Sequence, residues 1–241
     1  MNVLSLFSGI GGLELGLERA GMTTVGQVEL DPFCRRVLAK HWPEVPQHDD
    51  VRTTSEWWAS EPRPGVDVVC GGFPCQPFSG SGLQLGIADE RWGWPWMADV
   101  IRAVRPRYVV VENVAALIRH ADAFGVLLGD LHRFGFDAEW SVVTACAVGA
   151  PHRRRRLYLV AYPRGARLQG LHETRGNLDL QSVARDLRRH WESEPDLARV
   201  ADGIPRRLVR DPIHAYGNAV VPQVAELVGR LILEHAEAVV A

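Results

Sequence analysis

The residue best placed to do chemistry in this sequence is a cysteine between two prolines. Cys75 lies in segment 71–79, GGFPCQPFS, directly after an apolar run. Prolines restrict the backbone and glycine-rich loops are usually exposed, so the thiol is presented as a nucleophile. A thiolate needs a base or cationic surroundings to lower its pKa, and His152 with the arginines after it can supply them. The alternative is a cysteine buried as a small apolar residue, which describes the other three cysteines better.

An acidic residue ends a second apolar run. Glu112 lies in segment 109–114, VVVENV. A carboxylate at the end of an apolar strand is costly unless it has a role, such as holding or protonating a substrate heteroatom. The plainer interpretation is a cap for the helix that follows.

Four consecutive arginines lead into a third apolar run, in segment 151–158, PHRRRRLY. Alternate residues of a strand point to opposite faces, so Arg154 and Arg156 share one face while Arg153 and Arg155 share the other. We expect one pair to face a site and the other to face solvent or phosphate. A solvated basic edge is the alternative.

A glycine-rich loop precedes all of these residues. Segment 7–12, FSGIGG, follows a short apolar run and opens a helical pattern, so its backbone can approach a ligand beside the N–H groups of a helix. Its spacing differs from the dinucleotide-binding Gly-x-Gly-x-x-Gly pattern. Glu29 follows about 20 residues later, at a position where an acid can accept hydrogen bonds from ribose hydroxyls. Segment 49–51 lies where a third strand is expected to end. Together these segments predict an adenosine-bearing cofactor, although a structural turn and helix-capping acids are the simpler readings.

The elements that position these residues alternate between strands and helices. Strands are predicted at 3–6, 24–29, 66–70, 108–111, 142–146 and 157–161, and helices from 13, from 32, and at 97–104, 121–134 and 221–240. Asp31 is the predicted N-cap of the helix that begins at Pro32. This alternation predicts an α/β fold built on a mostly parallel sheet. We expect a catalytic and cofactor-binding domain at 1–163, a small basic insert at 164–204, and a C-terminal segment at 205–241.

Composition narrows the class of protein. With 46% hydrophobic and 23% charged residues, the 241-residue chain has the profile of a globular protein. It contains no apolar run long enough for a membrane span and no metal-binding cysteine spacing, so a cytoplasmic protein without a metal is expected. Residues 151–210 carry 14 arginines against seven acids, a net charge of +7 that points to an anionic partner such as nucleic acid.

Five segments, in order, resemble motifs of the DNA cytosine-5 methyltransferase family. Segment 7–12 resembles Phe-x-Gly-x-Gly-Gly, and segment 73–76 is similar to the Pro-Cys catalytic loop. Segment 112–114 resembles Glu-Asn-Val, segment 152–156 resembles Gln-x-Arg-x-Arg, and segment 217–222 resembles the final Gly-Asn-x-Val motif. The match covers about 200 residues.

The resemblance implies a Rossmann-like α/β fold with helices on both faces of the sheet and S-adenosylmethionine as the methyl donor. It assigns cofactor contacts to Phe7, Gly9, Ile10, Gly11, Gly12, Glu29, Leu30, Asp50, Val51, Pro74, Asn218 and Ala219.

The same resemblance implies a reaction at a cytosine flipped out of duplex DNA. Cys75 would add to carbon 6 of the ring, Glu112 would hold ring nitrogen 3 and the exocyclic amine, and Arg154 with Arg156 would brace the catalytic loop and the ring carbonyl. Contacts to DNA would come from Gln76, Ser79, Arg153 and Arg155.

The sequence departs from the family pattern at three places. His152 stands where the family usually has Gln, which would make that position sensitive to pH. Three tryptophans, Trp92, Trp94 and Trp96, replace a simpler Arg-Gly segment, and they fit either the core or the cofactor or base pocket. The insert at 164–204 is shorter than the recognition domain common in the family, as in small phage-like members.

Two other functions fit less well. An RNA methyltransferase that acts on tRNA would carry a Cys-Phe-Thr tripeptide in the recognition region, and none occurs here. A catalytically silent DNA-binding regulator would have no need for the intact Cys75, Glu112, Arg154 and Arg156. We expect a monomer whose partners are duplex DNA and a cognate restriction endonuclease.

Overall fold

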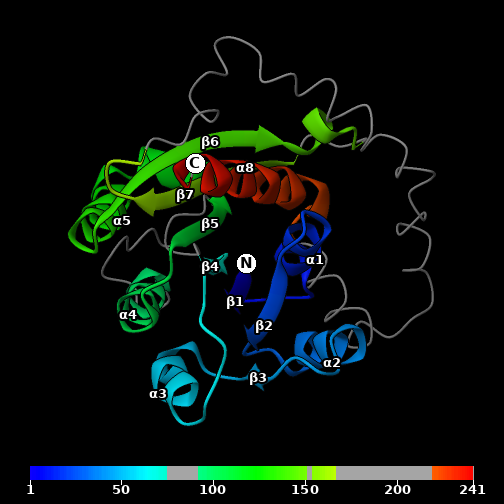
Figure 1. Cartoon of the computed structure of the whole chain (residues 1–241). Coiled ribbons are helices and arrows are strands. Elements are labelled where there is room, and N and C mark those ends of the chain that lie inside the picture. The colour runs from blue at the N-terminus through cyan, green and yellow to red at the C-terminus, as the bar shows by residue number, and fades with distance from the viewer. Residues whose placement is uncertain (75–91, 151–153, 167–218, 241) are drawn as a thin grey trace.

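The computed structural model describes residues 1–74, 92–150, 154–166 and 219–240 of the chain (Figure 1). These residues form a seven-stranded sheet with the strand order β3-β2-β1-β4-β5-β7-β6. Neighbouring strands are parallel from β3 to β5, whereas β7 is antiparallel to both β5 and β6. The strands are β1 (Asn2–Leu6), β2 (Thr23–Val28), β3 (Gln47–His48), β4 (Val68–Gly71), β5 (Tyr108–Val114), β6 (Phe136–Thr144) and β7 (Arg155–Pro163). The mostly parallel α/β sheet predicted from the sequence is confirmed.

Helices cover both faces of this sheet. They are α1 (Gly12–Arg19), α2 (Pro32–His41), α3 (Thr54–Ala59), α4 (Trp94–Val104), α5 (Ala121–Arg133) and α8 (Pro222–Val240), with short 3₁₀ helices η1 (Val51–Thr53), η4 (Ala115–Arg119) and η5 (Ala145–Val148). One core cluster joins the sheet to α4 and α5, and the other joins it to α1 and α8. Strand β5 contributes to both, because Val109 and Val111 point to the first cluster and Tyr108 and Val110 to the second.

The boundaries predicted from the sequence are close for most elements and wrong for some. The strand predicted at 142–146 is the end of the longer β6, and residues 145–146 belong to η5. The first part of β6 alternates acidic and apolar residues at a half-exposed sheet edge, so it has no continuous apolar signal. The helix predicted at 97–104 begins three residues earlier, at Trp94, and α3 was not predicted.

The start of α2 follows its predicted capping chemistry. One carboxylate oxygen of Asp31 accepts hydrogen bonds from the backbone N–H groups of Phe33, at 2.7 Å, and Cys34, at 3.1 Å. Pro32 occupies the first helical position, where the missing N–H of proline costs no hydrogen bond within the helix. Asp31 is therefore the N-cap, as the sequence predicts.

Helices α1 and α8 lie side by side because glycines remove the side chains between them (Figure 1). A Cβ atom on Gly12 would stand 2.6 Å from the carbonyl oxygen of Val220, and one on Gly229 would stand 2.7 Å from the Cβ of Ala20. A Cβ on Gly16 would overlap the carbonyl oxygen of Pro222. Since this close approach is backbone to backbone, it sets where the chain after residue 219 meets the loop before α1.

Most of the predicted insert at 164–204 lies outside the described residues, as does the start of the 205–241 segment. The boundaries of these two regions stay predictions. Within the described ranges, no helix has the length and apolar character that crossing a bilayer requires.

We predict that Gly16→Ala destabilises the protein by about 1–3 kcal/mol, because the new methyl group overlaps fixed backbone. Urea unfolding measures this change. Gly125→Ala is the matched control, since Gly125 is exposed on α5 with nothing within 4 Å of an added Cβ. The control is expected to be neutral or more stable by up to about 1 kcal/mol. Equal stabilities for Gly16→Ala and wild type would contradict the role given to this packing.

Candidate active site

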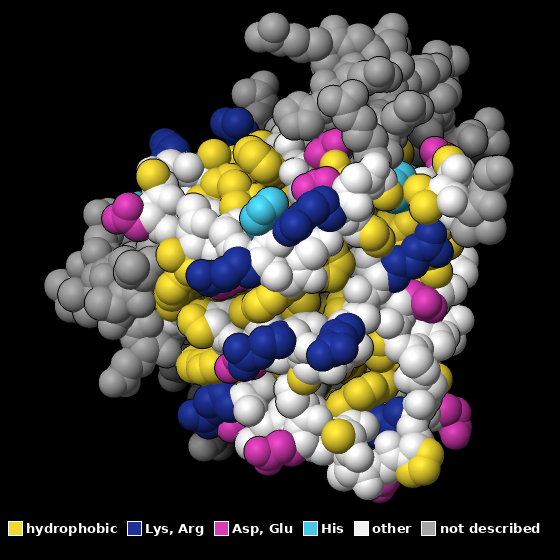
Figure 2. Space-filling model, turned by 60° about the vertical axis from the view of Figure 1, so that its left-hand side comes forward, with side chains coloured by type: hydrophobic (Ala, Val, Ile, Leu, Met, Phe, Trp, Pro, Cys, Tyr) yellow, Lys and Arg dark blue, Asp and Glu magenta, His cyan; other side chains and the backbone are white. Residues whose placement is uncertain are grey.

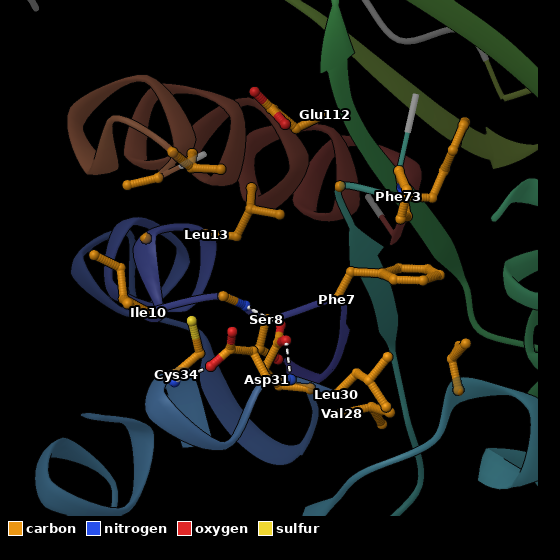
Figure 3. A pocket seen from close by; sticks show the side chains of 18 of the residues that line it. Phe7, Ser8, Ile10, Leu13, Val28, Leu30, Asp31, Cys34, Phe73 and Glu112 are labelled. Atoms are coloured by element: carbon orange, nitrogen blue, oxygen red, sulfur yellow. Dashed lines mark hydrogen bonds between the residues drawn. The ribbon is translucent and has the colours of Figure 1, made fainter. Parts of the chain in front are cut away.

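A cavity of about 690 Å³ opens at the carboxyl ends of the parallel strands (Figure 3). This is the edge where ligands bind in open α/β sheets, and the volume lies in the range of about 300–1,000 Å³ usual for cofactor sites. The lining comes from segments 7–10, 12–13, 28–32, 49–52, 72–74, 112–114 and 219–220, with Cys34, Trp96, Arg154 and Arg156. Residues from both ends of the chain therefore share one cavity.

The loop between β1 and α1 forms one wall of the cavity. Phe7 and Gly9 have positive φ angles of 54° and 56°, and the Ser8 N–H donates to the carbonyl of Val28 at 3.0 Å. A Cβ on Gly9 would meet nothing within 4 Å. Gly9 therefore leaves open space on the cavity side, whereas Gly11 and Gly12 are needed for packing. Gly11 is absent from the lining, and a Cβ on it would overlap the ring of Trp42.

Glu29 connects this loop to the start of α2. Its Oε2 accepts from the N–H of Gly9 at 2.7 Å, and its Oε1 accepts from the N–H of Asp31 at 2.8 Å. The sequence predicts a ribose contact for this carboxylate and gives no sign of the backbone bonds. Because a carboxylate has about four acceptor sites, two donors leave capacity for a ligand hydroxyl. Glu29 can thus shape the loop and bind a ligand at once.

Apolar and aromatic side chains also line the cavity. Leu30 is 72% exposed at its edge, although leucine is usually buried. Trp96 also lines the cavity, and the guanidinium carbon of Arg52 stands 6.0 Å from the centroid of its ring. Arg52 in turn pairs with Asp50, and hydrogen bonds from Arg52 lower the pKa of Asp50 to about 2. Leu30 and Trp96 thus offer apolar surface to a flat ligand group.

The three tryptophans of segment 92–96 divide between the two roles that the sequence left open. Trp92 and Trp94 are buried in the core, and the indole N–H of Trp94 donates to Asp130 at 2.8 Å. Trp96, by contrast, lines the cavity. Only the packing of α4 against the sheet decides which indole faces which way.

Glu112 lies deep in the cavity beside two arginines. The residue is 6% exposed, and its Oε1 is 3.1 Å from the Nε of Arg156. Burial raises the pKa of Glu112 to about 7 although Arg156 and Arg154 lower it. Burial likewise lowers the pKa of Arg154. Near neutral pH, the Glu112 carboxyl can therefore both accept and donate a proton.

The alternation predicted for the arginine run is found for the three arginines that the structure describes, which lie just before β7 and at its start. Arg154 and Arg156 line the cavity, and Arg156 faces Val114 across the β5–β7 pair. Arg155 is exposed and takes no part in the lining.

A buried amide anchors the segment that leads to Cys75. Asn113 is 4% exposed; its Nδ2 donates to the carbonyl of Phe73 at 3.0 Å, and its Oδ1 accepts from the N–H of Val114 at 2.8 Å. A Cβ on Gly72 would stand 3.0 Å from the Oε2 of Glu112, so this segment passes close to the acid. Asn113 lies within the Glu-Asn-Val segment but was not among the predicted site residues.

Most predicted cofactor residues that the structure describes line this one cavity. They are Phe7, Gly9, Ile10, Gly12, Glu29, Leu30, Asp50, Val51, Pro74 and Ala219. Six predicted residues lie outside the described part of the chain: Cys75, Gln76, Ser79, His152, Arg153 and Asn218. The lining also contains residues that were not among the predicted site residues, and Ser8, Cys34, Arg52 and Asn113 are examples of these.

The side of the molecule that carries α4 and α5 has no concentrated basic surface among the described residues (Figure 2). Basic side chains are interspersed there with acidic and apolar ones, as in the Arg102–Asp99 pair on α4 and the Arg133–Asp130 pair on α5. Most of the strongly basic stretch 151–210 lies outside the described residues. No group of three or more His, Cys, Asp or Glu that could hold a metal ion occurs among the described residues.

Comparison with known proteins identifies the family. Residues 1–197 match the family model of the C-5 cytosine-specific DNA methylase. The chain is 37% identical over 168 residues to the type II methyltransferase M2.BsuMI of Bacillus subtilis (strain 168), covering 67% of this chain and 42% of the relative. It is 27% identical over 190 residues to M.HhaI of Haemophilus parahaemolyticus, covering 78% and 56%. The chain belongs to the C-5 cytosine-specific DNA methylase family, and it spans about half the length of the curated relatives it matches.

Solved structures share the fold of this chain. A putative DNA modification methyltransferase encoded within an Escherichia coli prophage matches with a TM-score of 0.57 and 24% identity, over 68% of this chain and 47% of that one. A DNMT2 variant of Spodoptera frugiperda matches with a TM-score of 0.54 and 22% identity, over 68% and 50%. The Rossmann-like methyltransferase fold implied by the sequence resemblance is thereby confirmed.

We predict that the free energy of unfolding decreases as pH rises from about 5 to about 8. Burial raises the pKa of Glu14 and of Glu112 from 4.5 to about 7. Between these values the native state holds protons that the unfolded state releases, so stability falls with rising pH, on the order of 1–3 kcal/mol for each group. Urea titrations at several pH values measure this change. A stability that is level or rises across the window would contradict the burial of these carboxyls.

Proposed function

We propose that this chain transfers a methyl group from S-adenosylmethionine to carbon 5 of a flipped-out cytosine in duplex DNA. The observation that carries this proposal is that Glu112 and its two arginines line the same cavity as the glycine loop. Pro74, directly before Cys75, also lies in that lining. The cavity is therefore lined by the glycine loop, by the acid Glu112, and by the residue that precedes the proposed nucleophile.

The cavity suits an adenosine-bearing sulfonium cofactor. Open space at Gly9 and the N-terminus of α1 suit the carboxylate of a methionine moiety, and Glu29 retains acceptor capacity for ribose hydroxyls. Leu30, Val51 and Trp96 offer apolar surface for a purine. When bound, this group supplies an electrophilic methyl.

The residues of the chain would prepare the cytosine for that methyl. Cys75 as thiolate forms a bond to carbon 6, and the ring electrons move to carbon 5, which becomes nucleophilic. Glu112, protonated in part near neutral pH, shares its proton with ring nitrogen 3 and offsets the charge that builds up in the ring. Arg156 holds Glu112 in place. After carbon 5 gains the methyl and loses its proton to a base, the bond to Cys75 breaks and the thiolate returns.

DNA contacts are proposed for Gln76, Ser79, Arg153 and Arg155, and for the basic insert at 164–204. A base stacked in a duplex cannot reach a cavity of this kind, so the cytosine must turn out of the helix. Because the relatives are named type II methyltransferases, a companion restriction endonuclease is part of the proposal. The monomeric state stays a prediction.

We predict that Cys75→Ser reduces methyl transfer to background, because a serine hydroxyl at neutral pH is a far weaker nucleophile than a thiolate. The assay follows labelled methyl groups from S-adenosylmethionine into mixed-sequence duplex DNA, with bisulfite sequencing of the product. Calorimetry should show unchanged cofactor binding by the variant. Cys146→Ser is the matched control: Cys146 is exposed, does not line the cavity, and its variant should retain full activity.

The results of this assay distinguish the candidate functions. Label in one short sequence context would identify the target, and label in many contexts would show that the short insert reads little sequence. Full turnover by Cys75→Ser would contradict the mechanism. Label on tRNA but not on DNA would favour the RNA enzyme, and a chain that binds no cofactor would favour the silent regulator.

We predict that affinity for duplex DNA falls about tenfold or more between 50 and 200 mM salt, since arginines that contact phosphates release counterions. Arg155→Gln should weaken binding and reduce the slope of log affinity against log salt concentration by about one. Arg102→Gln, on α4 and paired with Asp99, is the control with the same loss of charge. A DNA affinity that does not change with salt concentration would contradict an arginine surface beside β7. The same holds if both variants change the salt dependence equally. Filter binding or fluorescence anisotropy measures both effects.

A further inference from the structure

Glu14 is a fully buried carboxyl group behind the wall of the cavity that the proposed reaction does not use. It lies in the first turn of α1 with 0% of its surface exposed, and its chain neighbour Leu13 lines the cavity. Within the part of the chain that the structure describes, neither carboxyl oxygen has a hydrogen bond of ordinary geometry. The hydroxyl groups of Ser5 and Ser8 lie beside it and lower its pKa, but burial dominates and raises the pKa to about 7.

The sheet places this carboxyl on the same face as Glu112. Ser5 pairs with Cys70 on β4, and Cys70 pairs with Val110 on β5, so these side chains form one row on the face covered by α1 and α8. Glu112 is two residues beyond Val110 on β5 and belongs to the next row on that face. The surroundings of Glu14 are thus adjacent to the site.

The groups that face Glu14 contain no cation among the described residues. They are the hydroxyl groups of Ser5 and Ser8, the buried thiol of Cys70, and, on its own helix, the carboxylate of Glu18. The buried acid of α8, Glu226, pairs with Arg230. Ionisation of Glu14 therefore creates a buried charge that no described residue neutralises.

The acids that line the cavity all have partners in the protein. Glu29 accepts from two backbone N–H groups, Asp31 caps α2, Asp49 pairs with Arg35, Asp50 pairs with Arg52, and Glu112 pairs with Arg156. Glu14 differs from these acids because, among the described residues, neither of its carboxyl oxygens has a hydrogen bond of ordinary geometry or an ion-pair partner. A cationic ligand in the cavity would supply a counter-charge.

We propose that Glu14 is a specificity-determining residue, which makes the cavity prefer the cationic sulfonium cofactor to its neutral thioether product. This inference rests on the proposed function. The two molecules differ by one methyl group and one positive charge. A positive charge in the cavity favours the ionised form of Glu14, and the low dielectric of the interior keeps that attraction from being screened. The thioether product lacks this charge and leaves Glu14 protonated.

A proton balance follows from this assignment. Near pH 7, binding of S-adenosylmethionine releases a proton from Glu14, whereas binding of S-adenosylhomocysteine releases none. By linkage, the affinity ratio of donor to product increases with pH, and then levels off once Glu14 is ionised in the free protein. After methyl transfer, Glu14 regains its proton, and the cavity has a lower affinity for the product than for the methyl donor.

Isothermal calorimetry on the wild-type chain tests the proton balance directly. Each ligand is titrated near pH 7 in two buffers with different ionisation enthalpies, and the difference gives the number of protons released. We expect a fraction of a proton for S-adenosylmethionine and none for S-adenosylhomocysteine. We also expect the affinity ratio to increase about tenfold between pH 6 and 8.

The variant Glu14→Gln keeps the shape of the protonated side chain and cannot ionise. It should lose the proton release and the pH dependence of the ratio, with little change in the affinity for the neutral product. Glu237→Gln removes the same charge from an exposed position at the far end of α8 and should behave as wild type. Circular dichroism verifies that each variant is folded, and the wild-type proton count stands on its own if Glu14→Gln does not fold.

The outcomes separate this inference from the proposed function. If wild type binds both ligands with equal proton release and a pH-independent ratio, the role of Glu14 is refuted while the cofactor assignment stands. The same holds if Glu14→Gln keeps the wild-type pH profile. If wild type binds neither ligand, the proposed function fails, and this inference fails with it.

Discussion

The close packing of α1 against α8 is the contact on which the cavity depends. Gly12 and Gly16 on one helix, and Gly229 on the other, allow the two backbones to approach each other without intervening side chains. The first of these glycines also ends the loop that lines the cavity, and it touches Val220, another lining residue. A chain segment more than 200 residues away in the sequence is thereby brought against that loop. Without this contact, the cavity would lose the wall supplied by Ala219 and Val220.

Burial of charge is the second organising feature of the site. Glu112 and Glu14 stand on the same face of the sheet, and burial raises the pKa of each to about 7. Their surroundings differ, since Glu112 has Arg156 beside it and Glu14 has hydroxyl groups and a thiol. Each carboxyl group lowers the stability of the fold near neutral pH, because the unfolded chain ionises it freely. Titratable groups whose pKa is strongly shifted in this way are common at binding and catalytic sites.

The sequence predicted the fold well where its signals are local. Continuous apolar runs indicated β1, β4 and β5, and Asp31 followed by Pro32 indicated the start of α2. The beginning of β6 was missed because an edge strand is half exposed and lacks such a run. Trp96 could not be separated from Trp92 and Trp94, because the direction of each indole depends on how α4 packs against the sheet.

The sequence by itself determined the family, the order of the motifs and the chemical types at the site, because these depend on residue identity and spacing. It also determined that Arg154 and Arg156 share a face, since strand geometry alternates side chains. Only the tertiary structure decided that Glu29 holds the loop at Gly9, that Arg156 pairs with Glu112, and that Glu14 lies buried without a counter-charge. Those facts depend on distances between segments far apart in the chain, which no local pattern contains.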